Sequence, residues 1–328
     1  MSDVARLAGV SAQTVSRVAA GSKHVRPDTR ERVLRAMNQL GYSPNRAAQA
    51  LRRGSFKTIG VLTQQIQRTG EALTTAGVLE AATAVDYAVN LVQVEHPAYE
   101  ELREAVYRLS HQAIDGLVVV QAGRAGREQL ALPPSMPVAV SDSTLVDYYP
   151  SASADQVGGV RDAVTHLLEL GHRTVHHVCG PEDSQSALIR KATWARTLRE
   201  TGRDVPEAVA GDWEAAAGYE AGLRLAADPE VTAVFCANDE LALGLIRAMH
   251  EQGRRVPSDV SVVGFDGLAV GEYSFPPLTT VRQDFKRHGR EMVSLVLEQA
   301  TSGPLDGGRS VVIPTELLVR GSTAPPAA

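Results

Sequence analysis

The sequence has little cysteine, few aromatic residues and no long apolar run. Only two cysteines, Cys179 and Cys236, occur among 328 residues, and they lie far apart in apolar segments. That usage favours free thiols in a reducing compartment over a disulfide framework. No run approaches the ~18 apolar residues that a membrane-spanning helix needs, and no basic segment followed by an apolar one opens the chain. We therefore expect a soluble, cytoplasmic protein with no membrane partner.

The motifs of several enzyme classes are missing as well. No G-x-G-x-x-G follows the first predicted strand and there is no G-x-x-x-x-G-K-[ST], so the usual cradles for dinucleotides and nucleoside triphosphates are absent. No Ser/His/Asp order or paired carboxylate stands out. Among nine histidines only His172, His176 and His177 lie close together, mostly on one predicted strand. We expect no enzyme, no cofactor and no metal site.

What the sequence does have is a marked asymmetry of charge. Residues 1–53 contain ten Lys or Arg against three Asp or Glu, a balance of +7. The remaining chain contains 23 basic against 35 acidic residues, a balance of −12. A basic N-terminal segment on an acidic body indicates that only this segment contacts a polyanion such as DNA.

The N-terminal segment has the spacing of a helix-turn-helix. DVARLA predicts a short helix that ends at Gly9, and Ser11 is placed as the N-cap of a second helix that runs to about Ala20. PDTRERVLRAMNQLG predicts a third helix that ends at Gly41. Its expected apolar stripe consists of Val33, Leu34, Met37 and Leu40. The following SPNRAAQALRRG predicts a helix of about two turns. A helix of this length is not stable alone in water, where ~12 residues are usually needed.

One side of the second helix is chemically suited to DNA bases. Thr14, Val15 and Val18 share the side expected to pack inward. The opposite side presents a small residue, an amide, a hydroxyl and a guanidinium, from Ala12, Gln13, Ser16 and Arg17. Gln can bond adenine through two hydrogen bonds, and Arg can bond guanine in the same way. A solvated helix face on a small bundle has the same composition, so this stretch alone leaves both interpretations open.

From Lys57 onward, short apolar strands alternate with amphipathic helices. The predicted strands fall into two groups, TIGVLT, NLVQV, DGLVVV and PVAVS and then TVHHVCG, TAVFCA and DVSVVGF. Helices are predicted at residues 156–170, 184–200 and 238–252. Such alternation is typical of parallel sheets covered by helices on both faces, and the two groups indicate two lobes.

Polar and aromatic side chains follow several of these strands. Ligands of open α/β sheets bind beyond the carboxyl ends of strands. The residues placed there are Trp213, Asn238, Asp266 and Gln283, and Arg190 is placed in the helix after CGPEDS. Acid, amide and guanidinium groups bond the hydroxyls of a pyranose, and a tryptophan covers the apolar face of its ring. Taken singly, Asn238 and Asp266 could equally cap turns, and Trp213 could pack on a sheet edge.

These segments together resemble a known family. DVARLAGVSAQTVSRV, TRERV, AMNQLGYSPNRAAQAL, ANDELALG and SVVGFDG are similar to motifs of the lactose-repressor (LacI/GalR) family of bacterial transcription regulators, along nearly the whole chain. GDW and PPLTTVRQDF are similar to those of the lactose-sensing member after which the family is named. The resemblance implies an all-α helix-turn-helix headpiece with a hinge helix, followed by a two-lobed α/β core of the periplasmic-binding-protein type with parallel sheets.

The resemblance also implies domain boundaries. The DNA-binding headpiece is expected at residues 1–43, the hinge helix at 44–54, and the ligand-binding and dimerisation core at 57–328. The first lobe of the core is expected at about 57–153 and 285–314, and the second lobe at about 154–283 and 315–328.

In this family the second helix enters the major groove, and the hinge helix folds on DNA and inserts a leucine into the minor groove. By motif match the major-groove readers are Ala12, Gln13 and Arg17, the leucine is Leu51, and Asn45 lies beside the hinge. Opening a base step costs a few kcal/mol, which the extra contacts on bent DNA offset.

By the same match, the second-lobe residues bond sugar hydroxyls or stack on the ring. The implied ligand residues are Arg190, Trp213, Asn238, Asp266, Gln283 and Phe285, with Gln64 from the first lobe. The first lobe departs from the lactose-sensing pattern, because Ala139, Val120 and Ser151 replace an Asp, an Asn and a Phe. Gln64 and Arg68 stand where that pattern has small and apolar groups. The sugar is therefore left open.

The implied function is a repressor of a sugar-utilisation operon, nucleoid-associated, that a galactoside or other glycoside releases from its operator. We expect a homodimer on a pseudo-palindromic operator, because no heptad repeat follows RSVVIPTELLVRGS. A family member that needs a co-repressor such as a purine is a second interpretation. A sugar-binding transport protein is a third, and the basic N-terminal segment argues against it.

Overall fold

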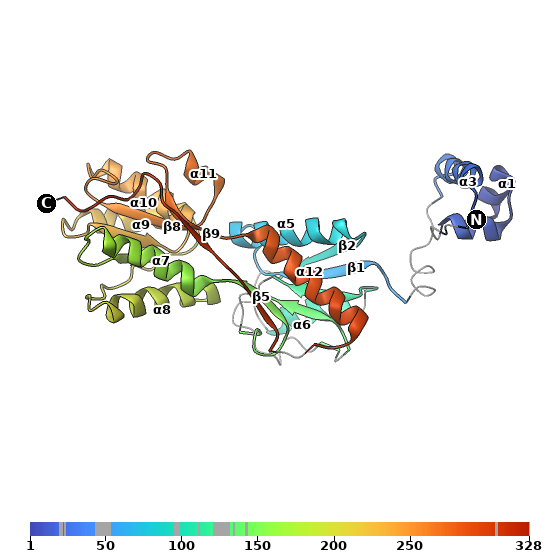
Figure 1. The fold of residues 1–328 in the computed structure, drawn as a ribbon, viewed down its shortest axis with the longest axis horizontal. Coiled ribbons are helices and arrows are strands. Elements are labelled where there is room, and N and C mark those ends of the chain that lie inside the picture. The colour runs from blue at the N-terminus through green and yellow to red at the C-terminus, as the bar shows by residue number, and fades with distance from the viewer. Residues whose placement is uncertain are drawn as a thin grey trace. The chain divides into compact units, whose positions relative to one another are not determined.

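The structure, a computed structural model, describes residues 1–19, 22, 24–42, 54–94, 99–110, 112–120, 132–133, 135–141, 144–305 and 308–327. They form two compact units, Met1–Lys57 and Thr58–Ala328 (Figure 1). The predicted hinge residues Asn45 and Leu51 lie outside the described residues.

The first unit contains the predicted helix-turn-helix, which we call the headpiece. Its helices are α1 (Ser2–Ala8), α2 (Ala12–Ala19) and α3 (Pro27–Gln39). Gly9 ends α1 with a φ of 61°, a left-handed conformation that glycine adopts without strain. The Ser11 hydroxyl oxygen accepts a hydrogen bond from the Thr14 backbone N–H at 3.1 Å, as an N-cap does.

The headpiece core is made of small and branched side chains from all three helices. The buried residues are Val4, Ala5, Ala8, Val15, Val18, Val33, Ala36 and Met37. The prediction for α3 was half wrong, because Leu34 and Leu40 are 47% and 46% exposed. The side of α3 that packs inward consists of Val33, Ala36 and Met37.

The first lobe of the core is a parallel sheet in the strand order β10-β5-β4-β3-β1-β2. Its strands are β1 (Thr58–Thr63), β2 (Ala88–Gln93), β3 (Gly116–Val119), β4 (Val138–Val140), β5 (Ser151–Ala154) and β10 (Ser310–Ile313). Its helices are α5 (Thr69–Ala84), α6 (Tyr99–Ser110) and α12 (Phe285–Ser302). The helices α5 and α12 pack together on one face, and α6 packs against β1 and β2.

The second lobe is a sheet in the order β11-β9-β8-β7-β6. Its strands are β6 (His176–Val178), β7 (Ala233–Cys236), β8 (Ser261–Asp266), β9 (Thr279–Arg282) and β11 (Glu316–Leu318). Its helices are α7 (Gln156–Glu169), α8 (Gln185–Glu200), α9 (Ala215–Ala226), α10 (Asp239–Glu251) and α11 (Ala269–Glu272). The strands are parallel except for the edge strand β11, which is antiparallel to β9 and which the predicted parallel sheets did not include.

The two lobes share three chain crossings. The chain passes from β5 to α7, from β9 to α12, and from β10 to β11. The predicted two-lobed α/β core is therefore confirmed, and its lobes are joined by short connections that leave the carboxyl ends of both sheets facing a common cleft. In the described part of the chain, no helix combines the length and the apolar character needed to cross a bilayer.

Candidate effector pocket and DNA-contacting helix

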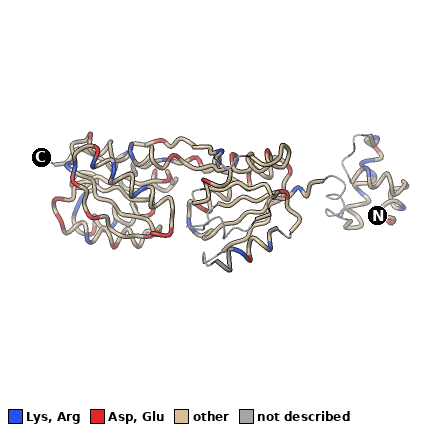
Figure 2. The backbone as a smooth tube through the Cα atoms, turned by 90° about the horizontal axis from the view of Figure 1, so that it is seen from below, with Lys and Arg blue, Asp and Glu red and all other residues tan. Residues whose placement is uncertain are grey.

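The outward side of α2 carries the residues predicted to read DNA. Ala12, Gln13 and Arg17 are exposed, and Ser16 is half-buried. Val15 and Val18 on the other side are buried in the headpiece core. Lys and Arg positions recur along the headpiece (Figure 2). The helix thus presents an amide and a guanidinium to solvent while its apolar side anchors it.

A pocket lies between the lobes of the core. The first lobe contributes the start of α5, Val120 beyond β3, Ser141 beyond β4, and residues of α12. Together with its opening to solvent, the pocket encloses about 580 Å³. Six of the seven predicted ligand residues line it, namely Arg190, Trp213, Asn238, Asp266, Gln283 and Phe285.

Four side chains on the second-lobe side, three of them buried and Gln283 half-buried, form a closed circuit of hydrogen bonds. Arg190 Nε donates to Gln156 Oε1 at 2.8 Å, and Gln156 Nε2 donates to Gln283 Oε1 at 3.4 Å. Gln283 Nε2 donates to Asp266 Oδ1 at 2.7 Å, and Arg190 Nη2 donates to the same oxygen at 3.4 Å. The circuit joins α7, α8, β8 and the end of β9, so it fixes the polar atoms that border the pocket.

Arg190 is held from several directions. Its guanidinium carbon lies 3.8 Å from the ring centroid of Phe265 and 5.5 Å from that of Trp213. Its Nη1 donates to the carbonyl oxygen of Ala237. A guanidinium that is 3% exposed needs such partners, because burying an unpaired charge is costly.

Burial raises the pKa of Asp266 to about 6, while Arg190 and Gln283 oppose the shift and Glu240 adds to it. The backbone of Asp266 has a φ of 115°, a conformation that strains a residue with a side chain. Strain of this kind is typical of functional sites, where the surrounding bonds hold it in place. Here Gln283 fixes Asp266 through both its side chain and its backbone N–H.

Asn238 and Trp213 are fixed to each other. Asn238 Oδ1 accepts from the Leu241 N–H at 2.9 Å and caps α10, and its Nδ2 donates to the Trp213 carbonyl at 3.0 Å. The capping role that the sequence left open for Asn238 is thus present in the structure, beside its place in the pocket wall. A Cβ on Gly180 would lie 2.5 Å from the Trp213 ring, so glycine is required for the ring to lie there.

Gln64 is the predicted ligand residue that is not part of the pocket wall. It is 3% exposed, and its backbone N–H donates to Glu71 Oε2 at 3.1 Å. The segment that it belongs to reaches the pocket through Arg68, Thr69, Gly70, Glu71 and Thr74 instead.

Several pocket residues were not predicted from the sequence. Gln156 and Glu71 are buried members of the wall, and so is His288, whose Nε2 lies 2.8 Å from the Ala152 carbonyl and 2.9 Å from Ser141 Oγ. The rule of polar residues beyond strand ends did not find Gln156, which lies two residues after β5, because β5 was not among the predicted strands. The described residues contain no group of His, Cys, Asp and Glu side chains arranged to hold a metal ion.

Comparison with known families separates the chain into two matching parts. Residues 1–45 match the model described as bacterial regulatory proteins, lacI family, and residues 164–323 match the periplasmic binding protein-like domain. A helix-turn-helix joined to a two-lobed binding core defines a transcriptional regulator that responds to a small molecule. The chain is 34% identical to the lactose operon repressor of Escherichia coli K12 over 99% of its own length and 90% of the relative's. The chain therefore belongs to the LacI family of transcriptional regulators, and its relatives are regulators rather than enzymes.

Other relatives of similar identity are also transcriptional regulators. The chain is 32% identical to the transcriptional repressor PurR of Haemophilus influenzae, with 98% of the chain and 97% of the relative covered. It is 33% identical to the regulator CelR of Thermobifida fusca, covering 97% and 96%. A solved lac repressor dimer bound to operator and the anti-inducer ONPF is similar over 98% of this chain and 98% of its own, with 33% identity and a TM-score of 0.87. A solved CelR–cellobiose complex has the same coverage, with 31% identity and a TM-score of 0.74.

Proposed function

We propose that the protein represses a sugar-utilisation operon and that a sugar bound between the lobes releases it from the operator. The observation that carries this proposal is the circuit of Arg190, Gln156, Gln283 and Asp266, which lies beside Trp213 in the pocket wall. Rigid donors and acceptors next to an indole ring match the hydroxyls and the apolar face of a pyranose.

The charges of the pocket support a neutral ligand. Among the lining residues that the structure describes, Arg68 and Arg190 are balanced by Glu71 and Asp266. A site for a phosphate or a carboxylate would show an excess of positive charge, and a site for an amine would show the opposite. A neutral polyol fits the balance.

We assign DNA recognition to the headpiece and the hinge. Ala12, Gln13, Ser16 and Arg17 read base edges in the major groove, and Leu51, with Asn45 beside the hinge, acts in the minor groove. The exposure of Gln13 and Arg17 on α2 and the lac repressor dimer solved on its operator support this assignment. The chain then acts as a homodimer whose two headpieces read two half-sites of a pseudo-palindrome.

Contacts between the lobes supply the conformational coupling. Thr69 Oγ1 donates to Glu240 Oε1 at 2.6 Å, and Arg68 Nη2 lies 3.7 Å from Asp183 Oδ2, so the first turn of α5 is tied to the second lobe. A ligand that changes the spacing of the lobes alters these contacts and the position of α5. It releases DNA only by preferring the lobe arrangement that binds DNA poorly, and a 100-fold preference supplies ~2.7 kcal/mol per site.

The similarity to PurR favours a second candidate, a regulator whose non-sugar effector strengthens DNA binding. The two candidates differ in both the ligand and the sign of the response. A purine requires stacking and ring-nitrogen contacts, whereas the circuit around Asp266 offers bonds suited to several hydroxyls.

The test is a titration of purified protein with mono- and disaccharides of glucose, galactose and xylose, with ribose, hypoxanthine and guanine as further ligands. Tryptophan fluorescence and melting temperature are followed for the wild type and for Asp266→Ala. The proposal predicts that one sugar raises the melting temperature of the wild type and not that of the variant. Response to a purine alone, or to none of these compounds, would overturn it.

A further inference from the structure

One part of the first-lobe wall of the pocket is mostly polar, and it is formed by Arg68 and the first two turns of α5. Arg68, Thr69, Gly70, Glu71 and Thr74 line the pocket there, and Gly70 leaves the wall open, since a Cβ on it would meet only Phe285 at 4.0 Å. These residues follow β1, as the pocket residues of the second lobe follow their own strands.

Glu71 is fixed through one carboxylate oxygen. Its Oε2 accepts from the Thr63 hydroxyl at 2.7 Å, from the Gln64 N–H at 3.1 Å and from the Gln65 N–H at 2.8 Å. The residue is 4% exposed, and its Oε1 is buried without a hydrogen-bond partner among the residues that the structure describes. The three bonds to Oε2 therefore set the orientation of an oxygen that the rest of the described chain does not use.

Arg68 shows the same division. Its Nη2 lies 3.7 Å from Asp183 of the second lobe, whereas its Nη1 is buried and has no partner within the described ranges. Buried polar atoms in proteins are nearly always bonded, so each exception requires an explanation. The wall thus contains one oriented acceptor and one oriented donor, both on residues that border the pocket.

We propose that Glu71 and Arg68 determine effector specificity by bonding hydroxyl groups that the ligand presents to the first lobe. Glu71 Oε1 accepts from one hydroxyl and Arg68 Nη1 donates to a hydroxyl oxygen, so the effector is hydroxylated on both of its sides. This inference rests on the proposed sugar response and adds the chemical class. The effector is a glycoside whose second unit is another sugar, rather than one with an aryl or alkyl aglycone.

An aromatic aglycone beside Arg68 and Glu71 would exclude water from this part of the pocket. Glu71 Oε1 and Arg68 Nη1 would then have no hydrogen-bond partner. A site built to bond a hydroxyl rejects an analogue that lacks it more strongly than an apolar pocket rejects an added group. A charged second unit is also disfavoured, because Arg68 and Glu71 have opposite charges and Asp183 already faces Arg68.

The experiment uses matched ligand pairs built on the sugar that the titration identifies. For glucose the pair is cellobiose and o-nitrophenyl β-D-glucoside, for galactose it is lactose and o-nitrophenyl β-D-galactoside, and for xylose it is xylobiose and o-nitrophenyl β-D-xyloside. Calorimetric titration of the full chain gives Kd for both members. We expect the disaccharide to bind at least tenfold more tightly.

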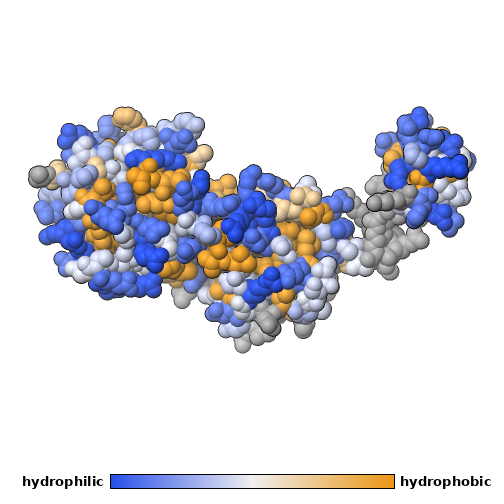
Figure 3. Space-filling model, viewed as in Figure 1, coloured by the Kyte–Doolittle hydropathy of each residue, from blue (hydrophilic) through white to orange (hydrophobic). Residues whose placement is uncertain are grey.

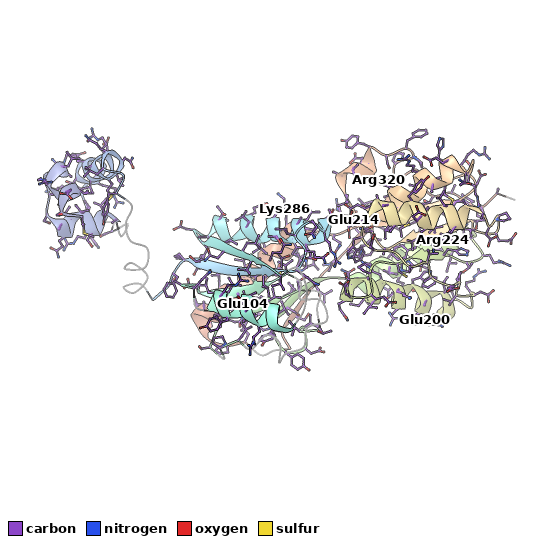
Figure 4. The ribbon with its side chains drawn as sticks, turned by 180° about the vertical axis from the view of Figure 1, so that it is seen from behind. Glu104, Glu200, Glu214, Arg224, Lys286 and Arg320 are labelled. Carbon is purple, nitrogen blue, oxygen red and sulfur yellow. The ribbon has the colours of Figure 1, made fainter. Side chains whose placement is uncertain are left out.

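Glu71→Gln is the diagnostic variant, because an amide oxygen can still accept the bonds that hold Oε2. It should weaken the disaccharide about tenfold to a hundredfold and the aryl glycoside less than threefold. Arg68→Met, which keeps an unbranched stem, should have the same selective effect. Glu80→Gln is the control, since Glu80 is an exposed residue of α5 that pairs with Lys286 of α12 at 3.0 Å. Lys286 is labelled in Figure 4.

The outcomes separate the two proposals. If no sugar of the panel binds, the proposed function fails and the inference fails with it. If a sugar binds but the aryl glycoside binds as tightly as the disaccharide, the sugar response stands and the assignment of the first-lobe wall is overturned. Equal loss of both ligands in Glu71→Gln also overturns it, because that result shows a structural role alone.

Discussion

Burial disfavours the charged form of two carboxyl groups, those of Asp266 and Asp239. Burial raises the pKa of Asp239 to about 7, with a further contribution from the charge of Asp266, while the Thr280 hydroxyl and backbone N–H groups oppose the shift. Asp239 Oδ2 accepts from the Leu268 N–H at 2.6 Å behind the pocket wall. Both carboxyl groups therefore have pKa values above that of an exposed aspartate.

We predict that Asp266→Asn changes the pH dependence of stability. The pKa of Asp266 in the folded protein is about 6, whereas an unfolded Asp titrates near ~3.9. The folded state therefore keeps a proton that the unfolded state releases, and stability from this group falls as pH rises from about 4 to about 6. The melting temperature of the variant relative to wild type should rise over this range and then level off. A difference that is constant or falls with pH would contradict the prediction.

Gln156→Leu is predicted to open the circuit. The substitution keeps the volume but leaves Arg190 Nε and Gln283 Oε1 without their partner. Urea unfolding should show a loss of about 1–3 kcal/mol, and the effector should bind more weakly. Gln252→Leu, at an exposed glutamine, is the matched control. Equal stability of the two variants would mean that the circuit contributes little.

The sequence predicted the second-lobe part of the pocket because its strands are strongly apolar and end in polar residues. Gln156 was missed because β5, the strand before it, reads Ser-Ala-Ser-Ala and has no apolar signature. Glu71 was missed because its burial depends on Thr63 and on two backbone N–H groups that only the folded loop brings together. Asn238 was predicted as a ligand residue. In the structure its side-chain amide caps α10 and also forms part of the pocket wall.

At the scale of helices and strands, glycine residues allow α5 and α12 to pack closely against each other. A Cβ on Gly289 of α12 would lie 2.1 Å from the carbonyl carbon of Gly77 on α5, and one on Gly77 would lie 2.5 Å from the Phe285 carbonyl oxygen. Backbone atoms cannot move aside as a side-chain end can. Small residues thus allow the close packing of the two helices that carry the first-lobe wall.

Gly289→Ala should therefore destabilise the core by about 1–3 kcal/mol through overpacking. Chemical denaturation of the full chain measures this loss. Ser294→Ala, at an exposed position of the same helix, should stay within about 0.5 kcal/mol of wild type. If Gly289→Ala were as stable as Ser294→Ala, the helices would not be in the close contact described.

Arg17→Ala tests the reading helix. Loss of one guanidinium that bonds a base should weaken binding to the specific operator about tenfold to a hundredfold. Melting of the core and effector affinity should not change, since Arg17 is exposed on α2. Arg173→Ala, which removes an exposed arginine of the core, is the control. Equal operator affinity of the two variants would remove Arg17 from the recognition surface.

Elements were easier to predict where their pattern is periodic. TIGVLT coincides with β1, and the predicted helix at residues 184–200 lies within one residue of α8. Helix α5 was not predicted, because its alanine, glycine and threonine residues give no clear apolar stripe. The error at Leu34 and Leu40 arose because helical spacing identifies a side of α3 only to within one residue.

At the scale of the whole molecule, the basic headpiece and the two-lobed core perform separate tasks. Apolar surface is visible on both lobes of the core (Figure 3), and Val270, Tyr273 and Phe275 are exposed.

Two lobes were predictable from the two groups of strands. The strand β11 was not, although residues 315–328 were expected in the second lobe, because its three residues, Glu316–Leu318, are too few to show a strand pattern.

The central claim is that a sugar bound between the lobes weakens operator binding. The most direct measurement is the affinity of the full chain for an operator that has been selected from random DNA duplexes. Fluorescence anisotropy gives this affinity with and without the sugar that the titration identifies. The account predicts at least tenfold weaker binding with the sugar for wild type and no change for Asp266→Ala. Unchanged or tighter operator binding in the presence of a sugar that demonstrably occupies the pocket would contradict it.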